Sequence, residues 1–300
     1  MTPATPDKRP CNLCGDTAWK VVFRFRGLQV ARCPACGFHF VVNPPALEEL
    51  SPLYHAGMYE GYWKYDSGFY ARNWQSTKDH TEDIMGDLET ESLGIERYFR
   101  RGRILDIGCF KGHFLRAMAQ RGWQTVGVDI SADAIEYGKK EFGLDLYCQD
   151  VSTLPCEPAS FDVATMWGVI EHLTDPARMV ASAAHFLKTK GLFVVKTQNQ
   201  DSLLTFFART LYALSLGTIN AQMEFFYSRE HLCRFSPRNL SRLLEKHGFA
   251  IDRITYDSAY IVKYALQNAK WHVRLPVRMV EWLSRVLNKQ DKMTVYAVKQ

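Results

Sequence analysis

The hydrophobic residues follow different periods in different parts of the chain. From Arg103 to about residue 200, short apolar runs that end in Gly or Asp alternate with amphipathic segments. Residues 104–108 and 123–129 have the length of buried strands, and residues 113–121 have the apolar spacing of a helix. This alternation predicts an α/β fold of the doubly wound type, with a parallel sheet that carries helices on both faces. Such sheets bind ligands at the carboxyl ends of their strands.

The N-terminal segment has a different signature, based on cysteine. Four of the eight cysteines form two C-x-x-C pairs, Cys11 with Cys14 and Cys33 with Cys36. The eighteen residues between the pairs fall within the spacing that is typical of a zinc site. Four thiolates complete a closed tetrahedral shell, so we expect a structural Zn²⁺. The alternating pattern of residues 19–25 predicts one strand of the small ribbon around it.

Changes in pattern also indicate where the domains begin and end. A proline pair at 44–45 and a new strand after residue 101 mark the boundaries. We expect three units with these bounds: a zinc ribbon at 1–45, an aromatic linker and helical segment at 46–100, and a main domain at 101–300 with helical insertions at about 201–228 and 264–290. Residues 58–74 are dense in Tyr, Trp and Phe, which predicts either a lid over the ligand site or packing between the ribbon and the main domain.

Composition limits the expected location and partners. The 37 Lys and Arg against 32 Asp and Glu leave a net charge of +5, which is too small for a dedicated nucleic-acid binder. Residues 1–10 lack the apolar core of a signal peptide, and 203–216 is too short for a membrane span. We therefore expect a cytoplasmic protein. Residues 1–45 carry six Lys or Arg against two Asp, so a ribbon contact with RNA stays open beside a packing role.

A series of motifs between residues 100 and 200 resembles the class I S-adenosylmethionine-dependent methyltransferases. In chain order these motifs are LDIGCFKGHFL, GVDIS, QDVSTLP, FDVATMWGVIEHLTDP and GLFVVKTQ. A nicotinamide dehydrogenase would need G-x-G-x-x-G, whereas this chain has G-C-F-K-G. Together with the ribbon, the resemblance points to a subgroup of sugar and small-molecule methyltransferases with an N-terminal zinc ribbon. It implies a mostly parallel, seven-stranded sheet.

The same resemblance implies the residues that bind the cofactor. Gly108 and Gly112 allow the backbone to approach the cofactor closely. Asp106 would contact the ammonium side of the methionine moiety, and Asp129 would accept hydrogen bonds from both ribose hydroxyls. The middle position of the glycine motif, commonly glycine, is Phe110 here, which makes the loop bulkier. The predicted cofactor-binding set is Asp106, Gly108, Cys109, Gly112, Asp129, Ile130, Asp150, Val151 and Trp167.

Within that set, the resemblance places Asp150 against the adenine amino group, and the Val151 amide donates to a ring nitrogen. Trp167 lies in a loop whose backbone touches the methionine moiety in relatives. The cofactor is therefore expected to span the ends of several strands.

The predicted catalytic residues come from two further motifs. Glu171 and His172 follow the strand expected at 161–166, and in relatives they lie near the reacting centre. An E-H-L element, Glu230 to Leu232, precedes F-S-P at 235–237 and resembles the active-site Glu-His pair of zinc-ribbon methyltransferases. Imidazole titrates near neutral pH and suits a general base. We predict His231 as that base, with Glu230 assisting it and His172 as a second catalytic residue.

These observations together predict transfer of a methyl group from S-adenosylmethionine to a small polar metabolite. The expected acceptor is a hydroxyl or carbon of a nucleotide-linked sugar or a related glycan precursor. Two alternatives remain at this point: an RNA methyltransferase that uses the basic ribbon, and a non-catalytic cofactor-binding module. The insertion at 264–290 combines apolar and basic residues, so peripheral membrane contact or binding of an anionic substrate group stays open beside a role as a solvated cap.

Overall fold

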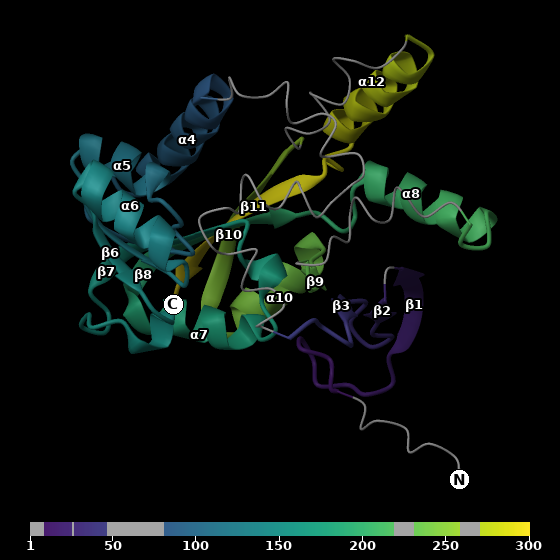
Figure 1. The fold of residues 1–300 in the computed structure, drawn as a ribbon, viewed down its shortest axis with the longest axis horizontal. Coiled ribbons are helices and arrows are strands. Elements are labelled where there is room, and N and C mark those ends of the chain that lie inside the picture. The colour runs from purple at the N-terminus through teal and green to yellow at the C-terminus, as the bar shows by residue number, and fades with distance from the viewer. Residues whose placement is uncertain (1–8, 26, 47–80, 219–230, 259–270) are drawn as a thin grey trace.

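The computed structural model describes residues 9–25, 27–46, 81–218, 231–258 and 271–300. Two features predicted from the sequence, the aromatic segment 58–74 and Glu230, lie outside these residues. Within them the chain forms one seven-stranded sheet flanked by helices and a second, four-stranded sheet near the N-terminus (Figure 1).

The large sheet has the strand order β10-β11-β8-β7-β4-β5-β6. Its strands are β4 (Arg103–Ile107), β5 (Gln124–Asp129), β6 (Asp145–Cys148), β7 (Phe161–Trp167), β8 (Leu187–Gln198), β10 (Phe249–Asp257) and β11 (Lys292–Lys299). Strands β4 to β8 pair in parallel, whereas β11 pairs antiparallel with both β8 and β10. The predicted α/β fold with a mostly parallel, seven-stranded sheet is confirmed.

The helices lie on both faces of this sheet because its central strands are apolar on both sides. The successive residues Ile104 and Leu105 of β4 belong to two different buried clusters. The cluster with Leu105 contains residues of α7 and α10, and the cluster with Ile104 contains residues of α4, α5 and α6. The helices are α4 (Thr81–Glu96), α5 (His113–Gln120), α6 (Ala132–Phe142), α7 (Pro176–Phe186), α8 (Leu203–Leu214), α10 (Pro237–Lys246) and α12 (Trp271–Val286), with short 3-10 turns η1 (Val151–Thr153) and η2 (Ile170–His172).

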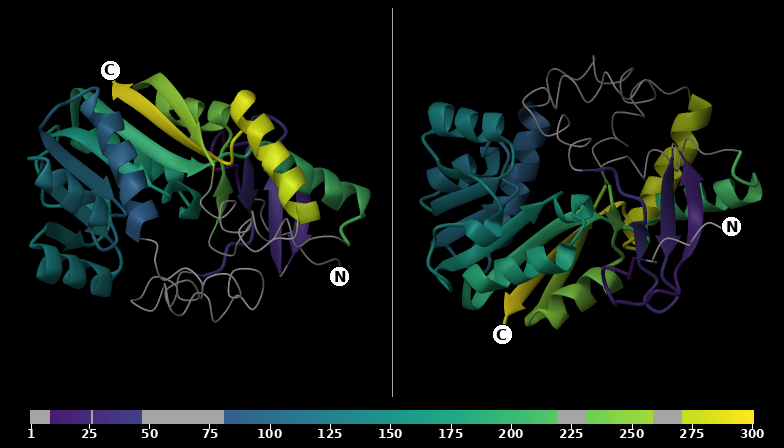
Figure 2. Two further views of the ribbon diagram at one scale, coloured as in Figure 1. Left: turned by 90° about the horizontal axis from the view of Figure 1, so that it is seen from above. Right: turned by 60° about the horizontal axis from the view of Figure 1, so that its bottom comes forward.

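The small sheet joins the N-terminal ribbon to the main domain. Its order is β1-β2-β3-β9, and its strands are β1 (Lys20–Phe25), β2 (Leu28–Arg32), β3 (His39–Val41) and β9 (Cys233–Arg234). Because β9 follows His231 in the chain, the fourth strand of this sheet comes from the second predicted catalytic motif. Figure 1 shows the purple ribbon strands close to β9, and the views of Figure 2 show the same strands near the green helix α8.

Apolar packing reinforces this junction. Phe23, Val30 and Val41 of the ribbon form a buried cluster with Ala208 of α8 and with Leu232. The Val41 amide also donates a hydrogen bond to the Leu232 carbonyl at 2.9 Å. The ribbon is therefore packed into the molecule, and not a separate lobe.

The two predicted insertions contain α8 and α12, each within its predicted range. Among the described helices, none combines the length and the apolar character that a membrane span requires.

Candidate functional site

A cleft of about 590 Å³ opens at the carboxyl ends of the parallel strands. The residues that line it follow β4, β5, β6 and β7, where a doubly wound sheet places its ligand. Its walls are formed by Pro45, Ile107, Gly108, Phe110, Val128, Asp129, Ile130, Ser131, Gln149, Asp150, Val151, Trp167, Gly168, Val169, His172, Leu173, Thr174, Asp175, Arg178, Met179, Ser182 and Leu232. Six of the nine predicted cofactor residues are among them.

The glycine-rich loop after β4 depends on its glycines. Gly108 and Gly112 both have φ of +78°, a left-handed conformation that an L side chain rarely adopts. A Cβ on Gly108 would lie 2.4 Å from Val169 Cγ2, and a Cβ on Gly112 would lie 2.7 Å from Leu144 Cδ1. Gly108 lines the cleft, whereas Gly112 lies behind it and lets α5 begin close to the sheet.

Phe110 adopts the left-handed conformation although it is not glycine, with φ of 48°. Its amide donates a 2.9 Å hydrogen bond to Asp129 Oδ2, and Ser131 donates a 2.8 Å bond to Asp129 Oδ1. The carboxylate of Asp129 therefore ties the loop after β4 to the loop after β5 and is held at the cleft wall. Burial raises the pKa of this carboxyl, and the two amide bonds oppose that rise.

Asp106 lies beneath the floor of the cleft, and is only 2% exposed. Burial raises the pKa of its carboxyl to about 7, although the Thr165 hydroxyl, which donates a 2.8 Å hydrogen bond, opposes the rise. Cys109 is also buried below the loop, and burial raises the pKa of its thiol. Asp106 and Cys109 therefore do not line the cleft in this structure, whereas their neighbour Gly108 does.

At the opposite end of the cleft, Asp150 caps the turn η1. Its carboxylate accepts hydrogen bonds from the Ser152 amide at 2.9 Å and the Ser152 hydroxyl at 2.6 Å, which lowers its pKa. Arg178 lies 3.3 Å away in an exposed ion pair. Ile130, which lines the cleft as Asp150 does, is 56% exposed, so its apolar side chain is available to pack against the flat ring of a ligand.

Several polar atoms at the cleft have no hydrogen-bond partner among the described residues. They are Ser131 Oγ, Gln149 Nε2 and Trp167 Nε1, and all three residues line the cleft. Buried polar groups are normally paired, and each unpaired one costs about 1–3 kcal/mol. A ligand with hydroxyls and ring nitrogens, such as the adenosine part of S-adenosylmethionine, has the partners that these atoms lack. The residues present thus fit the cofactor.

The structure brings His172 and His231 together from motifs 59 positions apart in sequence. Their rings meet edge to face with centroids 4.8 Å apart. His172 lines the cleft, and Gln198 Nε2 lies 3.3 Å from His231 Nδ1. Glu230, the predicted partner of His231, lies outside the described residues.

Glu171 completes this group, although the sequence analysis did not assign it a role. Its carboxylate is 4% exposed and accepts a 2.7 Å hydrogen bond from the Thr197 hydroxyl. One ligand atom each from Glu171, His172 and His231 lies within 4.8 Å of the others. We call these three side chains the Glu-His-His cluster. The sequence signal for Glu171 was its place beside His172, but only the fold shows that its carboxylate lies near both histidines.

Pro45 and Leu232, which the sequence analysis did not select, also line the cleft beside this cluster. Pro45 is the last residue of the ribbon, and Leu232 packs in the ribbon's apolar cluster. Arg9 Nη2 and Asn12 Nδ2 donate hydrogen bonds to the Thr174 carbonyl in the cleft wall at 2.8 and 2.7 Å. The ribbon therefore supports one wall of the cleft.

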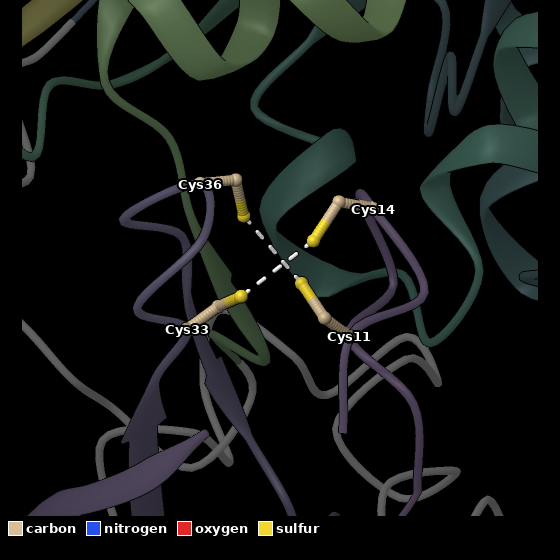
Figure 3. A group of neighbouring side chains, drawn as sticks. All are labelled: Cys11, Cys14, Cys33 and Cys36. Atoms are coloured by element: carbon tan, nitrogen blue, oxygen red, sulfur yellow. Dashed lines mark hydrogen bonds between the residues drawn. The ribbon is translucent and has the colours of Figure 1, made fainter. Parts of the chain in front are cut away.

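The four ribbon cysteines converge on one point (Figure 3). Cys11 and Cys36 have their Sγ atoms 3.7 Å apart, and the Sγ atoms of Cys14 and Cys33 are 3.5 Å apart. Sulfurs at 2.3 Å from a tetrahedral Zn²⁺ are about 3.8 Å from one another, so this spacing fits that ion. The thiol of Cys36 lowers the pKa of Cys11 to about 5, and Cys11 raises that of Cys36, because the two share one proton.

Known proteins match the part of the chain that builds this cleft. The family model described as a methyltransferase domain matches residues 84–254. The ubiquinone biosynthesis O-methyltransferase of Idiomarina loihiensis is 36% identical over 108 residues, which cover 33% of this chain and 43% of that protein. The ubiquinone biosynthesis O-methyltransferase of Coxiella burnetii is 31% identical over 103 residues, covering 33% and 44%. The chain thus spans less than half the length of these curated relatives.

A solved structure matches a larger share of the fold. It is a chain from the complex between the Haloferax volcanii Trm112 methyltransferase activator and the putative methyltransferase, with a TM-score of 0.55 and 16% identity. The match covers 81% of this chain and 96% of that one, and it supports the fold assignment alone.

Proposed function

The chain belongs to the methyltransferase domain family and has the class I fold of S-adenosylmethionine-dependent methyltransferases; on this premise we propose that it methylates a hydroxyl of a small polar acceptor. The observation that carries the proposal is the pair His172 and His231, which stands beside a cleft of cofactor size. The names of the curated relatives support oxygen as the methylated atom.

In the proposed complex, each end of the cofactor has its own residues. Asp129 would accept hydrogen bonds from the ribose hydroxyls, and Asp150 with the Val151 amide would hold the adenine. Asp106, below the floor beside Gly108, would supply a negative charge to the ammonium group. When bound, S-adenosylmethionine supplies a methyl group whose carbon bonds to the acceptor oxygen as the carbon–sulfur bond breaks. The proton that the protein has to move is therefore the proton of the acceptor.

His231 is the proposed base for that proton, with His172 beside it. A positioned imidazole contributes about 10²- to 10⁴-fold in rate. His172 lines the cleft directly, so its second role is to contact the acceptor. The side chains of Leu232 and Pro45 exclude water on this wall.

Within this function we propose a nucleotide-linked sugar or related glycan precursor as the acceptor class. The E-H-L and F-S-P elements support it, through their resemblance to zinc-ribbon enzymes that act on such sugars. The names of the curated relatives support a phenolic acceptor of a biosynthetic pathway as the competing class. The two classes share a hydroxyl and differ in the group that carries it.

We also propose a structural Zn²⁺ on Cys11, Cys14, Cys33 and Cys36. The closed shell leaves no position for a substrate, so the ion would stabilise the ribbon and the wall that rests on it. The ribbon of residues 1–45 and the main domain of residues 101–300 would accordingly act as one catalytic unit.

The test is a screen of turnover with S-adenosylmethionine labelled in its methyl group, against nucleotide-linked sugars and phenolic acceptors. The acceptor found is then used for single-turnover rates from pH 6 to 9. We expect His231→Ala to lower the rate by about 10²- to 10⁴-fold and to leave cofactor affinity unchanged, because a base acts only in the transition state. A His231→Ala variant with the wild-type rate, beside an inactive His172→Ala variant, would show that the other histidine is the base.

A further inference from the structure

A buried acid lies beside the proposed base, and nothing described so far gives it a function. Glu171 is 4% exposed, and burial of a carboxylate is costly unless the charge is paired and hydrogen-bonded. The Thr197 hydroxyl supplies one hydrogen bond at 2.7 Å, but it carries no charge. Among the described residues, an imidazolium could supply the opposite charge, because His172 and His231 each have a ring nitrogen within 4.8 Å of a carboxylate oxygen of Glu171.

We propose that Glu171 is the positioning residue that holds the His231 imidazole in place and stabilises its protonated form. Glu171 does not line the cleft, so it would act through the histidines and not on the acceptor. The inference rests on the proposed function and adds to it the acid that serves the base. The prediction for Glu230 is not tested by it, because Glu230 lies outside the described residues.

The surroundings of the cluster support a specific electrostatic role. Glu171 belongs to the turn η2, and Thr197 to the neighbouring strand β8, so two elements of the fold hold the carboxylate. The proton that leaves the acceptor oxygen bonds to an imidazole nitrogen, and the ring becomes a cation. A carboxylate within about 4–6 Å favours that cation and raises the pKa of the ring by about 1–3 units.

The other charged groups on neighbouring elements have partners of their own. On β8, the Lys196 ammonium is 3.2 Å from Glu91 and 3.5 Å from Asp257. On β9, the Arg234 guanidinium faces Gln200 and Thr205, and the Cys233 thiol faces the Leu173 carbonyl. Among the described His, Cys, Asp and Glu side chains, those that form a group with His231 within 4.8 Å are Glu171 and His172.

The Gln198 amide is placed to select the tautomer of the His231 ring. Its nitrogen lies 3.3 Å from His231 Nδ1, and its oxygen is buried with no partner among the described residues. Rotation of the amide by half a turn would bring that oxygen to the ring, where it accepts from an N–H. The opposite ring nitrogen would then carry the lone pair that a base needs.

The experiment measures the titration of His231 directly, so it does not depend on the acceptor or on turnover. Protein labelled with ¹³C at histidine Cε1 is titrated by NMR with S-adenosylmethionine bound, and His231→Gln assigns the signal. Glu171→Gln keeps the shape of the side chain but removes its charge. We expect this change to lower the pKa of His231 by about one to two units.

Two further variants test whether the change in the His231 pKa comes from Glu171. Asp162→Asn removes a carboxylate at the opposite end of β7, where it accepts from the Arg103 amide and pairs with Lys188. It should leave the His231 titration unchanged. Thr197→Val removes the hydroxyl that holds Glu171, and it should lower the His231 pKa by less than Glu171→Gln does. It also serves as the test if Glu171→Gln fails to fold.

In turnover assays, the acidic limb of the pH–rate profile of Glu171→Gln should move to lower pH by the same amount, a change that a purely structural role would not produce. An unchanged His231 titration in folded Glu171→Gln would overturn the proposal. If that variant does not fold, an unchanged titration in Thr197→Val would overturn it. Saturable binding of Mn²⁺ or Zn²⁺ to the cluster, lost in Glu171→Gln and required for turnover, would also overturn it and make the cluster a metal site.

Discussion

Cofactor binding should depend on pH near neutrality, because Asp106 is buried. Its pKa of about 7 means that the carboxylate, which would attract the ammonium group of S-adenosylmethionine, forms as the pH rises through 7. About half of the Asp106 side chains are ionised at pH 7 and about 3% at pH 5.5. If the ionised form binds, affinity falls about sixteenfold over this interval on acidification. The α-amino group of the cofactor stays protonated in this range, since such groups titrate near pH 8.

Isothermal calorimetry between pH 5.5 and 7 measures both the affinity for the cofactor and the number of protons that are released or taken up on binding. Binding at pH 6.5 should release about 0.8 proton, because that fraction of Asp106 is protonated beforehand. The released proton is measured from the change of apparent enthalpy between buffers of different ionisation heat. We expect protons to be released on binding, because the cofactor favours the ionised carboxylate of Asp106.

Two variants identify the group responsible. Asp106→Asn should bind weakly at pH 7 and lose this pH dependence, and any slope that remains belongs to Asp129, whose pKa burial also raises. Thr165→Val removes the hydroxyl that lowers the pKa of Asp106, so the midpoint should move to higher pH. An affinity that stays constant from pH 5.5 to 7 in the wild type, or an equal slope in Asp106→Asn, would refute the reasoning.

Three further predictions concern the cofactor loop and the ribbon. Asp129→Ala should weaken S-adenosylmethionine binding by about ten- to a hundredfold, because the variant lacks the proposed charged acceptor of the ribose hydroxyls. Calorimetry showing wild-type affinity in the folded variant would contradict this prediction. Changing Cys33 and Cys36 to Ser should remove the bound zinc, as measured by metal analysis. The change should lower turnover more than cofactor affinity, since the ribbon supports the cleft wall that carries the histidines. Zinc retained by this variant would contradict the site. Gly108→Ala should cost about 1–3 kcal/mol more in denaturant unfolding than Gly143→Ala, because both glycines have positive φ but only a Cβ at Gly108 would clash with a neighbour. Equal costs would speak against that contact.

The apolar periodicity determined the main architecture without reference to tertiary contacts. Strands that are buried on both faces must be apolar throughout, and the runs at 104–108 and 123–129 were therefore found at β4 and β5. The acids and glycines that end these strands meet at one edge because parallel strands point the same way. For this reason the positions of Gly108 and Asp129 at the cleft were predictable from their place in the motif.

The cysteine pairs were equally local in origin. A C-x-x-C turn places two thiols near one ion by itself, so the convergence of Cys11, Cys14, Cys33 and Cys36 followed from spacing. The packing of the ribbon against the main domain did not follow from this spacing. The strand β9 that completes the ribbon sheet is two residues long, and it lies nearly 200 positions from β3.

Tertiary structure alone decided which side chains lie beside His231. The sequence analysis paired His231 with Glu230 because the E-H-L element resembles the Glu-His pair of zinc-ribbon methyltransferases. In the fold, the turn after β7, strand β8 and the residues before β9 bring Glu171, Thr197 and His231 together, a grouping that the sequence analysis did not predict. Contacts of this kind depend on how distant elements pack against each other. No local pattern of hydrophobic or polar residues encodes them, because the pattern sets the face on which a side chain lies and not its partner in another element.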